Sequence, residues 1–226
     1  TIRTINGMRL LISGLGNGGV HAIKPQTGET VWSFPAAKRA VNTGVVIKGN
    51  TVFMSHGDEN FDTVEMGLIA AFDGSESGTI STRKWSTTGV KFRTSSPVLD
   101  GDRLYQIDGG GTLHSFDTET GQEYWTQRLG NAQQAPLVMG DGKLYAGTNG
   151  GSFFIIRPHA DRAEVLSQVT LPLSTNSCCG SEGTPEQIVS GAAISNGRVF
   201  FVSSDAVYAI GPKVAKTTKG LAVNEK

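Results

Sequence analysis

The sequence predicts an all-β fold made of many short strands. Three observations predict it: a high glycine content, a hairpin-like segment that recurs along the chain, and Trp residues that share one position of the repeat. Gly accounts for 30 of the 226 residues, which is nearly twice the average share of roughly 7%. Because Gly disfavours helices and suits tight turns, the composition argues against a helix bundle.

The charge balance and the hydropathy exclude two classes of partner. Lys and Arg total 20, as do Asp and Glu, so the net charge is zero. A chain without excess positive charge has no general electrostatic attraction to nucleic acid or to an anionic membrane. No apolar run in the sequence approaches the roughly 18 residues that cross a bilayer. We therefore predict no nucleic-acid partner and no membrane span.

The repeat is a turn followed by a small apolar strand, and it occurs five times. Its copies are residues 7–11, 49–53, 101–105, 141–145 and 196–200. The last residues of successive copies are 42, 52, 40 and 55 positions apart. These spacings bracket the roughly 40–50 residues of a four-stranded propeller blade.

Each copy predicts the second strand of a sheet, and the other strands follow in order. A first strand precedes four of the turns, at residues 44–47, 97–99, 136–139 and 192–194. The turns between these strands are Gly-Asn, Gly-Asp, Asp-Gly and Asn-Gly, which favour hairpins because they accept positive φ. The third strand is expected at residues 20–23, 68–72, 113–116, 153–156 and 207–210.

The fourth strand carries every Trp of the protein: Trp32, Trp85 and Trp125. In the fourth unit Val165 and Leu166 are expected at this position. A single four-stranded sheet cannot bury both faces, but neighbouring sheets in a radial array cover one another, and Trp fills the wide gap near their outer edges. We therefore predict a β-propeller of four-stranded antiparallel blades. A β-sandwich with accidental periodicity is the alternative.

The strand inventory predicts about five blades of a longer ring. The first unit is expected to lack its inner strand and the last unit its outer strand, so the two ends do not complete one blade between them. We expect residues 1–212 to form part of a seven- or eight-bladed propeller and residues 213–226 to be a polar tail or linker. A complete five-bladed ring is the alternative.

Residues 111–125 read Gly-x-Leu-x-x-Phe-Asp-x-x-Thr-Gly-x-x-x-Trp, and residues 18–32 are a second good copy. This unit resembles the repeat of the pyrroloquinoline-quinone-like (PQQ-like) propellers. That family includes quinoprotein dehydrogenases and non-catalytic relatives such as the lipoprotein of the outer-membrane barrel assembly machine. The resemblance covers roughly residues 9–212. It is specific for fold and less so for function, because the motif residues are structural.

The resemblance implies two candidate functions. The first is a non-catalytic propeller, a rigid scaffold or binding platform for a protein or small ligand, with partner proteins or the remaining blades covering the open edges. The second is part of a PQQ- and calcium-dependent quinoprotein dehydrogenase that oxidises alcohols or sugars. The second needs a Trp floor beneath the quinone, whereas all three Trp are assigned to outer strands. PQQ and Ca²⁺ are therefore implied by the resemblance alone.

Ligand contacts are expected in the connections that enter the innermost strands. Arg93 is the candidate for an anionic ligand, because Arg grips carboxylates with two parallel hydrogen bonds and the quinones of this family are tricarboxylates. A surface ion pair is the alternative for Arg93. Asn131, Gln133 and Gln134 are neutral polar groups that are expected to line a central funnel.

The second unit has a long acidic connection between its second and third strands. The alternating oxygen donors Asp58, Asn60 and Asp62, followed by Glu65, are similar to the start of a calcium loop. The Gly and the distant Glu of that motif are out of register. The alternatives are a solvated acidic loop, a calcium site and a ligand contact.

The adjacent cysteines and two of the histidines are further candidates for a chemical role. Cys178 and Cys179 predict a vicinal disulfide that orders a loop, with free thiols or a cofactor or metal contact as alternatives. A disulfide would suit a periplasmic or secreted bacterial protein. His21 and His114 occupy equivalent positions on third strands, which indicates packing or a strand surface rather than catalysis. No catalytic residue is assigned.

Overall fold

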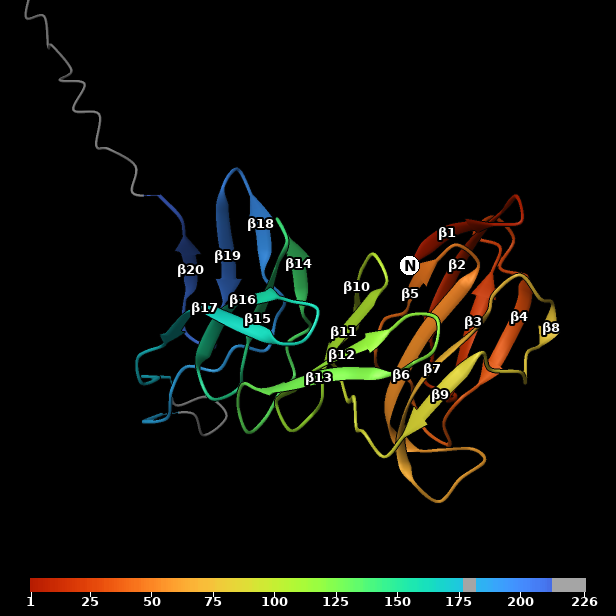
Figure 1. The fold of residues 1–226 in the computed structure, drawn as a ribbon, viewed down its shortest axis with the longest axis horizontal. Coiled ribbons are helices and arrows are strands. Elements are labelled where there is room, and N and C mark those ends of the chain that lie inside the picture. Colours follow the sequence, from red (N-terminus) through yellow and green to blue (C-terminus); the bar gives the residue numbers. More distant parts are fainter. Residues whose placement is uncertain (177–181, 213–226) are drawn as a thin grey trace, which may run out of the picture.

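The computed structural model describes residues 1–176 and 182–212, which form five β-sheets that follow one another in chain order (Figure 1). We call these sheets blades 1 to 5. Blade 1 contains β1 (Ile2–Ile5), β2 (Met8–Gly14), β3 (Gly19–Ile23) and β4 (Thr30–Pro35). Blade 2 contains β5 (Val46–Lys48), β6 (Thr51–Glu59), β7 (Met66–Asp73) and β9 (Trp85–Thr88).

The remaining blades repeat this pattern. Blade 3 contains β10 (Val98–Asp100), β11 (Arg103–Ile107), β12 (Thr112–Asp117) and β13 (Glu123–Arg128). Blade 4 contains β14 (Val138–Gly140), β15 (Lys143–Gly147), β16 (Ser152–Pro158) and β17 (Ala163–Thr170). Blade 5 has three strands in the described part of the chain: β18 (Ala193–Ser195), β19 (Arg198–Val202) and β20 (Val207–Ile210). The predicted all-β fold of antiparallel blades is confirmed.

The five blades do not close on themselves. Figure 1 shows β1 to β4 at one side of the molecule and β18 to β20 at the other, with blades 2, 3 and 4 between them. Each pair of neighbouring blades packs face to face around its own apolar layer, as in the stack of Phe34 on Phe72 between blades 1 and 2 at a centroid distance of 4.3 Å. No helix in the described residues is long and apolar enough to cross a membrane.

The expectation that the first unit lacks an inner strand is wrong. Strand β1 pairs with β2 in antiparallel register, from Ile2 opposite Leu11 to Ile5 opposite Met8. The turn between them consists of Asn6 (φ 48°) and Gly7 (φ 77°), which are the two positive values that a tight hairpin turn requires. Blade 1 is therefore a complete four-stranded sheet.

An additional short strand ties blade 2 to blade 1. The connection between β7 and β9 contains β8 (Gly78–Thr79), which pairs in parallel with β4 through Trp32 opposite Gly78. Ile80 follows it and is completely buried in the apolar layer between the two blades. We call residues 74–84 the strap, because they cross from blade 2 onto the outer edge of blade 1.

Each Trp fastens its blade to the next one. The indole Nε1–H donates to a backbone carbonyl of the following blade: Trp32 to Gly74 at 2.8 Å, Trp85 to Thr118 at 2.9 Å and Trp125 to His159 at 3.1 Å. In all three cases the acceptor is the first residue after the third strand of that blade. The indole rings are at most 9% exposed, so these hydrogen bonds are shielded from water.

The strand register corrects the expected counterpart of these Trp in blade 4. In blades 1 to 3, a positive-φ Gly lies at or just before the start of the third strand. The fourth residue after this Gly pairs with the Trp of the outer strand: Trp32, Trp85 or Trp125. In blade 4 that Gly is Gly151, the fourth residue is Ile155, and its partner is Ser167. Ser167, and not Val165 or Leu166, therefore holds the Trp position. The turn before it is two residues longer than in blade 3 (Ile156 to Ser167, against Phe116 to Trp125). For this reason the spacing of the other repeats predicted a position before Ser167.

Candidate functional site

The candidate site lies at one end of the blades, which we call the loop face. This face combines the turns between second and third strands with the connections from each blade to the next, at residues 36–45, 89–97 and 129–137. It is the lower side of blade 2 in Figure 1, where the turn between β6 and β7 projects. Gly residues in left-handed conformation permit these turns, and Gly111 illustrates why: at φ 87°, an added Cβ would lie 2.7 Å from the backbone of Gly130.

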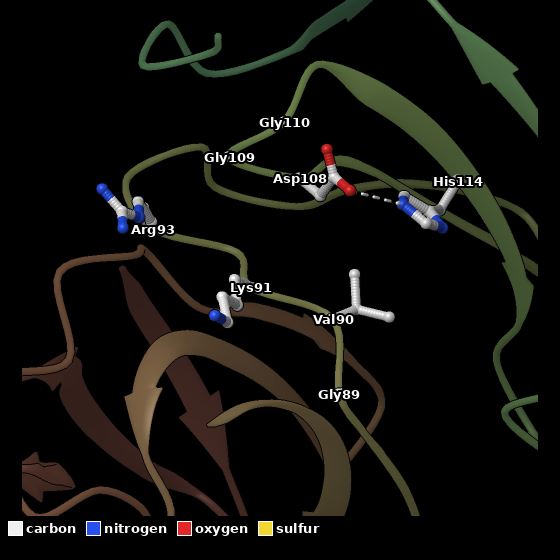
Figure 2. Close-up of a pocket in the computed structure, with 8 residues that line it drawn as sticks. All are labelled: Gly89, Val90, Lys91, Arg93, Asp108, Gly109, Gly110 and His114. Carbon is white, nitrogen blue, oxygen red and sulfur yellow. Dashed lines mark ion pairs between the residues drawn. The ribbon is translucent and has the colours of Figure 1, made fainter. Parts of the chain in front are cut away.

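A pocket of about 510 Å³ opens on the loop face between blades 2 and 3. We call it the cation pocket. Figure 2 shows Lys91 and Arg93 on one side of it and the pair of Asp108 and His114 on the other. The rest of the lining is Gly89, Val90, Gly109 and Gly110.

Buried neighbours fix the backbone that carries the two cations. Phe92, which lies between them, is completely buried in the apolar layer of blades 2 and 3. The N–H of Gly109 donates to the carbonyl oxygen of Lys91 at 2.8 Å. The aliphatic part of Arg93 lies between two glycines, since an added Cβ would come within 3.0 Å of it at Gly57 and 3.1 Å at Gly109. The sequence thus provides a narrow slot for this side chain.

Arg93 also lines a second pocket of about 330 Å³. Its other lining residues are Asn42, Gly57, Asp58, Thr94 and Gln134. The predicted ligand residues Arg93 and Gln134 are therefore brought together. The backbone carbonyl of Gln134 accepts a hydrogen bond from Thr94 Oγ1 at 3.0 Å, and its side-chain Oε1 accepts from Asn149 Nδ2 at 3.1 Å.

His114 forms the buried wall of the cation pocket. It is 6% exposed, its Nδ1 lies 2.5 Å from Glu123 Oε1, and its Nε2 lies 3.5 Å from Asp108 Oδ2. Burial alone would lower the pKa of His114, but the neighbouring carboxylates of Asp108 and Glu123 raise it by more, so the pKa is raised. Burial would raise the pKa of Asp108, but His114 and the N–H of Thr112 outweigh it and lower that pKa. The pair thus favours an imidazolium beside a carboxylate.

Sequence reasoning did not single out His114 as part of a pocket, because its repeat equivalent His21 looked the same. Both side chains lie on the face turned to the preceding blade, but only blade 3 has a preceding blade in the described residues. His21 lies on the face of blade 1 that points away from blade 2 and contacts Asn17 at 3.1 Å. His114 points towards blade 2, with the ring of Phe92 edge-on at 5.5 Å. The two carboxylates around His114 are the signal that distinguishes it, because blade 1 has Leu15 where blade 3 has Asp108.

The structure divides the other predicted funnel residues. Gln133 is 3% exposed, and its Nε2 donates to the carbonyl oxygens of Ala135 and Gly147 at 2.8 and 2.6 Å. The side chain of Gln133 therefore holds the connection against β15 and is not brought together with Arg93 and Gln134. Asn131 lines a separate pocket of about 380 Å³ beside blade 4, and its Oδ1 accepts from Arg128 Nη2 at 3.3 Å.

The acidic connection of blade 2 does not gather its carboxylates. Asn60 is 1% exposed, and its Nδ2 donates to the backbone carbonyls of Glu65 and Gly67. Asp62 pairs with Arg83 at 2.9 Å, the carboxylate of Glu65 accepts a hydrogen bond from Thr88, and Asp58 faces the second pocket. In the part of the chain that the structure describes, no three residues of His, Cys, Asp and Glu are placed to hold a metal ion. The geometry therefore gives the calcium prediction no support.

Cys178 and Cys179 lie outside the described residues, so the predicted vicinal disulfide stays a prediction. The flanking chain is well fixed. Ser174 N–H donates to the carbonyl of Thr184 at 2.7 Å, and Ser174 Oγ donates to the carboxylate of Asp205 at 2.8 Å. The two residues that flank this segment, Ser174 and Thr184, are therefore joined by a backbone hydrogen bond.

Comparison with known proteins identifies the repeats. Residues 65–159 include the last two strands of blade 2, all of blade 3 and the first three strands of blade 4. They match a family model of PQQ repeats described as outer membrane protein assembly factor BamB. This part of the chain carries PQQ-like repeats. The predicted family is thereby confirmed on the blades that form the cation pocket.

Solved structures show that the PQQ-like repeats here build a propeller fold. BamB from Moraxella catarrhalis is similar with a TM-score of 0.67 at 14% identity, over 93% of this chain and 57% of that one. A computationally designed protein, Ika8, gives 0.65 at 14% identity over 93% and 57%. A chain of a mitotic checkpoint complex gives 0.64 at 13% identity over 88% and 60%.

Among curated proteins, the chain is similar to a tetrathionate hydrolase of Acidithiobacillus ferrooxidans. The two are 25% identical over 135 residues, which is 52% of this chain and 26% of the hydrolase. The chain thus spans about a quarter of that protein and under two thirds of each similar structure. These likenesses show the fold, and the activity of a longer protein is not carried over by them.

The described residues do not fit the quinone and calcium pair that the PQQ-like resemblance implies. A quinone floor needs an indole face towards the ligand, but all three Trp are buried between blades and bonded to backbone carbonyls. A calcium ion needs converging oxygen ligands, and the acidic side chains of blade 2 diverge as described above. We derive no chemical step through these groups.

Proposed function

We propose that this chain is part of a larger PQQ-like propeller that acts as a non-catalytic binding platform for a protein or small ligand in a periplasmic or secreted setting. The observation that carries the proposal is the preorganised loop face between blades 2 and 3. Arg93 is exposed there, yet buried Phe92 and the glycine slot hold its backbone and its aliphatic stem. Preorganised side chains lose little entropy on binding. The family description as an outer membrane assembly factor supports the proposed location.

The open ends of the blade array support the existence of further blades. The face of blade 5 that points away from blade 4 is apolar, with Phe200 paired to Ala193 and Ala209, and Val202 paired to Val207. Val207 is 73% exposed and Val202 is 48% exposed. Contiguous apolar side chains on a sheet face call for a covering layer. We propose that the remaining blades of the same protein cover this face.

A photo-crosslinking experiment in the full-length protein tests the binding platform. A photoreactive residue at Gln134 samples the loop face, and one at Gln26, in the turn between β3 and β4, samples the opposite end of the blades. We expect a discrete adduct from Gln134 in the native cell and none from Gln26. Equal labelling at both positions, or none at Gln134, Thr94 and Asn131, would overturn the proposal.

The rival reading is a fragment of a quinoprotein dehydrogenase, which only the repeat resemblance supports. It predicts that PQQ together with Ca²⁺ raises the melting temperature of the purified full-length protein and adds quinone absorbance. A shift that requires both ligands would favour the dehydrogenase over the platform. Unchanged melting with either ligand, alone or together, would exclude it for this protein.

A further inference from the structure

Two exposed cations face the cation pocket without a partner. No hydrogen bond or ion pair joins the side chain of Lys91 or of Arg93 to any residue in the described ranges 1–176 and 182–212. By contrast, Arg128 beside Gly110 is engaged, since it donates to Thr112 Oγ1 at 3.2 Å and to Asn131 Oδ1 at 3.3 Å. Two unpaired cations on the rim of one pocket create a positive potential that favours anions.

A third group, His114, lies in the buried wall of the same pocket. Its Nε2 faces Asp108 Oδ2 at 3.5 Å, an ion pair too long for a normal hydrogen bond (Figure 2). Asp108 Oδ1 already accepts from the N–H of Thr112 at 2.8 Å. Buried polar atoms are normally satisfied, so Nε2 would gain a hydrogen bond from a ligand oxygen that entered the wall beside Asp108.

We propose that the cation pocket binds a small dianion, gripped by Lys91 and Arg93 and reached by Nε2 of His114. This inference deepens the proposed binding function, because it names what one part of the platform takes up. The positive charges around the ligand are Lys91, Arg93 and the imidazolium of His114. The negative charges are Asp108 and Glu123.

The ligand class follows from the donors. A monoanion would satisfy one cation and leave the other unpaired, whereas a doubly charged phosphate or a short dicarboxylate can engage both. Arg presents a planar fork that matches two oxygens, and Lys acts as a point charge. The volume of about 510 Å³ falls within the roughly 300–1,000 Å³ of small-molecule pockets. Phosphate and dicarboxylate share this chemistry, and the experiment separates them.

Titration of the purified full-length protein at low ionic strength tests the proposal. The probes are inorganic phosphate, succinate, acetate and chloride, followed by calorimetry and by the imidazole NMR signals. We expect saturable binding of phosphate or succinate, with acetate and chloride at least tenfold weaker. The signals of His114 should shift on binding, whereas those of His21, its repeat equivalent in blade 1, should not.

Charge-matched variants separate a built site from a general charge effect. The double variant K91Q/R93Q should weaken binding of the preferred dianion by at least about tenfold, since hydrogen bonds to charged groups each contribute about that much or more. The control K38Q/R39Q removes the same two charges from the equivalent connection between blades 1 and 2, where both side chains are exposed, and should bind as the unaltered protein does. The single variant K91Q serves if the double variant melts early.

Three results would overturn the site: no saturable binding of either dianion, chloride binding as tightly as the dianions, or equal weakening by both double variants. None of these measurements requires a protein partner. Failure here would therefore leave the crosslinking test of the platform intact, and failure of that test would leave this one intact.

Discussion

The interface between blades 1 and 2 and the interface between blades 4 and 5 each contain a pair of stacked Phe rings but differ at the outer strand. Phe34 of β4 stacks on Phe72 of β7 at 4.3 Å, and Phe153 of β16 stacks on Phe201 of β19 at 4.1 Å. Between blades 1 and 2, Trp32 and the strap close the outer edge, and Trp32 is 1% exposed. Between blades 4 and 5, Ser167 replaces the Trp, and β17 is exposed after its first residue, with Val165 and Val169 each 42% exposed.

This difference shows how much the outer strand contributes to holding two blades together. In blade 1 the outer strand β4 supplies both the stacked ring of Phe34 and the indole of Trp32, which fills the gap and donates to the next blade. In blade 4 the stacked ring is on the third strand, and the polar contacts lie away from β17, where Glu186 accepts from the hydroxyls of Ser203 and Tyr208. We therefore expect blade 5 to open more readily than blade 2.

The largest expected effect is that of Trp32→Ala. The substitution leaves a large cavity and an unsatisfied Gly74 carbonyl, so the free energy of unfolding should fall by about 3–5 kcal/mol. Urea unfolding measures it. Leu166→Ala on β17, where the side chain is 37% exposed, is the control and should cost less than about 1 kcal/mol. Equal losses from the two variants would contradict the stronger role of the outer strand in blade 1.

Phe201→Ala should have the next largest effect, and a local one. Phe201 is 2% exposed and stacks on both Phe153 and Tyr208, so its loss should cost about 3 kcal/mol. Because blade 5 has only one covered face in the described chain, hydrogen exchange should rise in β19 and β20. Exchange in β6 and β7 should stay as it was. Uniform acceleration across all blades would show that the array unfolds as one unit.

A smaller, pH-dependent effect is expected at the interface of blades 2 and 3, where His114 is buried between two carboxylates. Burial lowers the pKa of His114, but Asp108 and Glu123 raise it by more. A raised folded pKa means that the stabilisation is complete below the unfolded value of about 6.5 and is lost as pH rises through the folded pKa. As the pH is raised from about 5 to about 8, the urea concentration at the unfolding midpoint should therefore fall more for the unaltered protein than for His114→Gln. Parallel pH profiles of the two proteins would refute it.

The smallest expected effect is a gain from Ser167→Trp. An indole at this position would face blade 5 and could donate to the carbonyl of Gly211, the first residue after β20, as the other three Trp do. Since the outer edge stays partly open to water, the gain should be below about 1 kcal/mol. A rise in melting temperature checks it, with Ser167→Ala as control. A loss of stability would show that blade 5 is too distant for this contact.

Much of the fold was predictable because local chemistry encodes it. Positive-φ turns such as Gly101 and the Asp141–Gly142 pair mark the hairpins, and the Trp mark the outer strands. Strand β1 escaped prediction because its Ile-Arg-Thr-Ile sequence has no apolar run. The strap escaped because residues 74–84 are mostly polar and pair with a strand some 45 positions earlier. Such long-range pairing leaves no local pattern.

The candidate site was predictable only in part. The rule that ligands meet the connections into inner strands located Arg93 and Gln134. It could not show that the Gln133 side chain is buried, because the sequence does not tell whether a Gln side chain points to solvent or towards the neighbouring strand. The role of His114 depended on which face of its strand meets another blade, and on Glu123 reaching it from β13. Both follow from the assembled blades and not from the repeat.

The strap has a consequence for behaviour in concentrated solution. An uncovered outer strand exposes a row of free N–H and C=O groups that can template pairing with another molecule. On blade 1 the strap occupies the edge of β4 at Trp32 and Ser33, so that row is already capped. The edges of β9, β13 and β17 have no such cap in the described chain, and β17 is the longest of the three. Self-association, if it begins at a sheet edge, should therefore favour β17 and avoid blade 1.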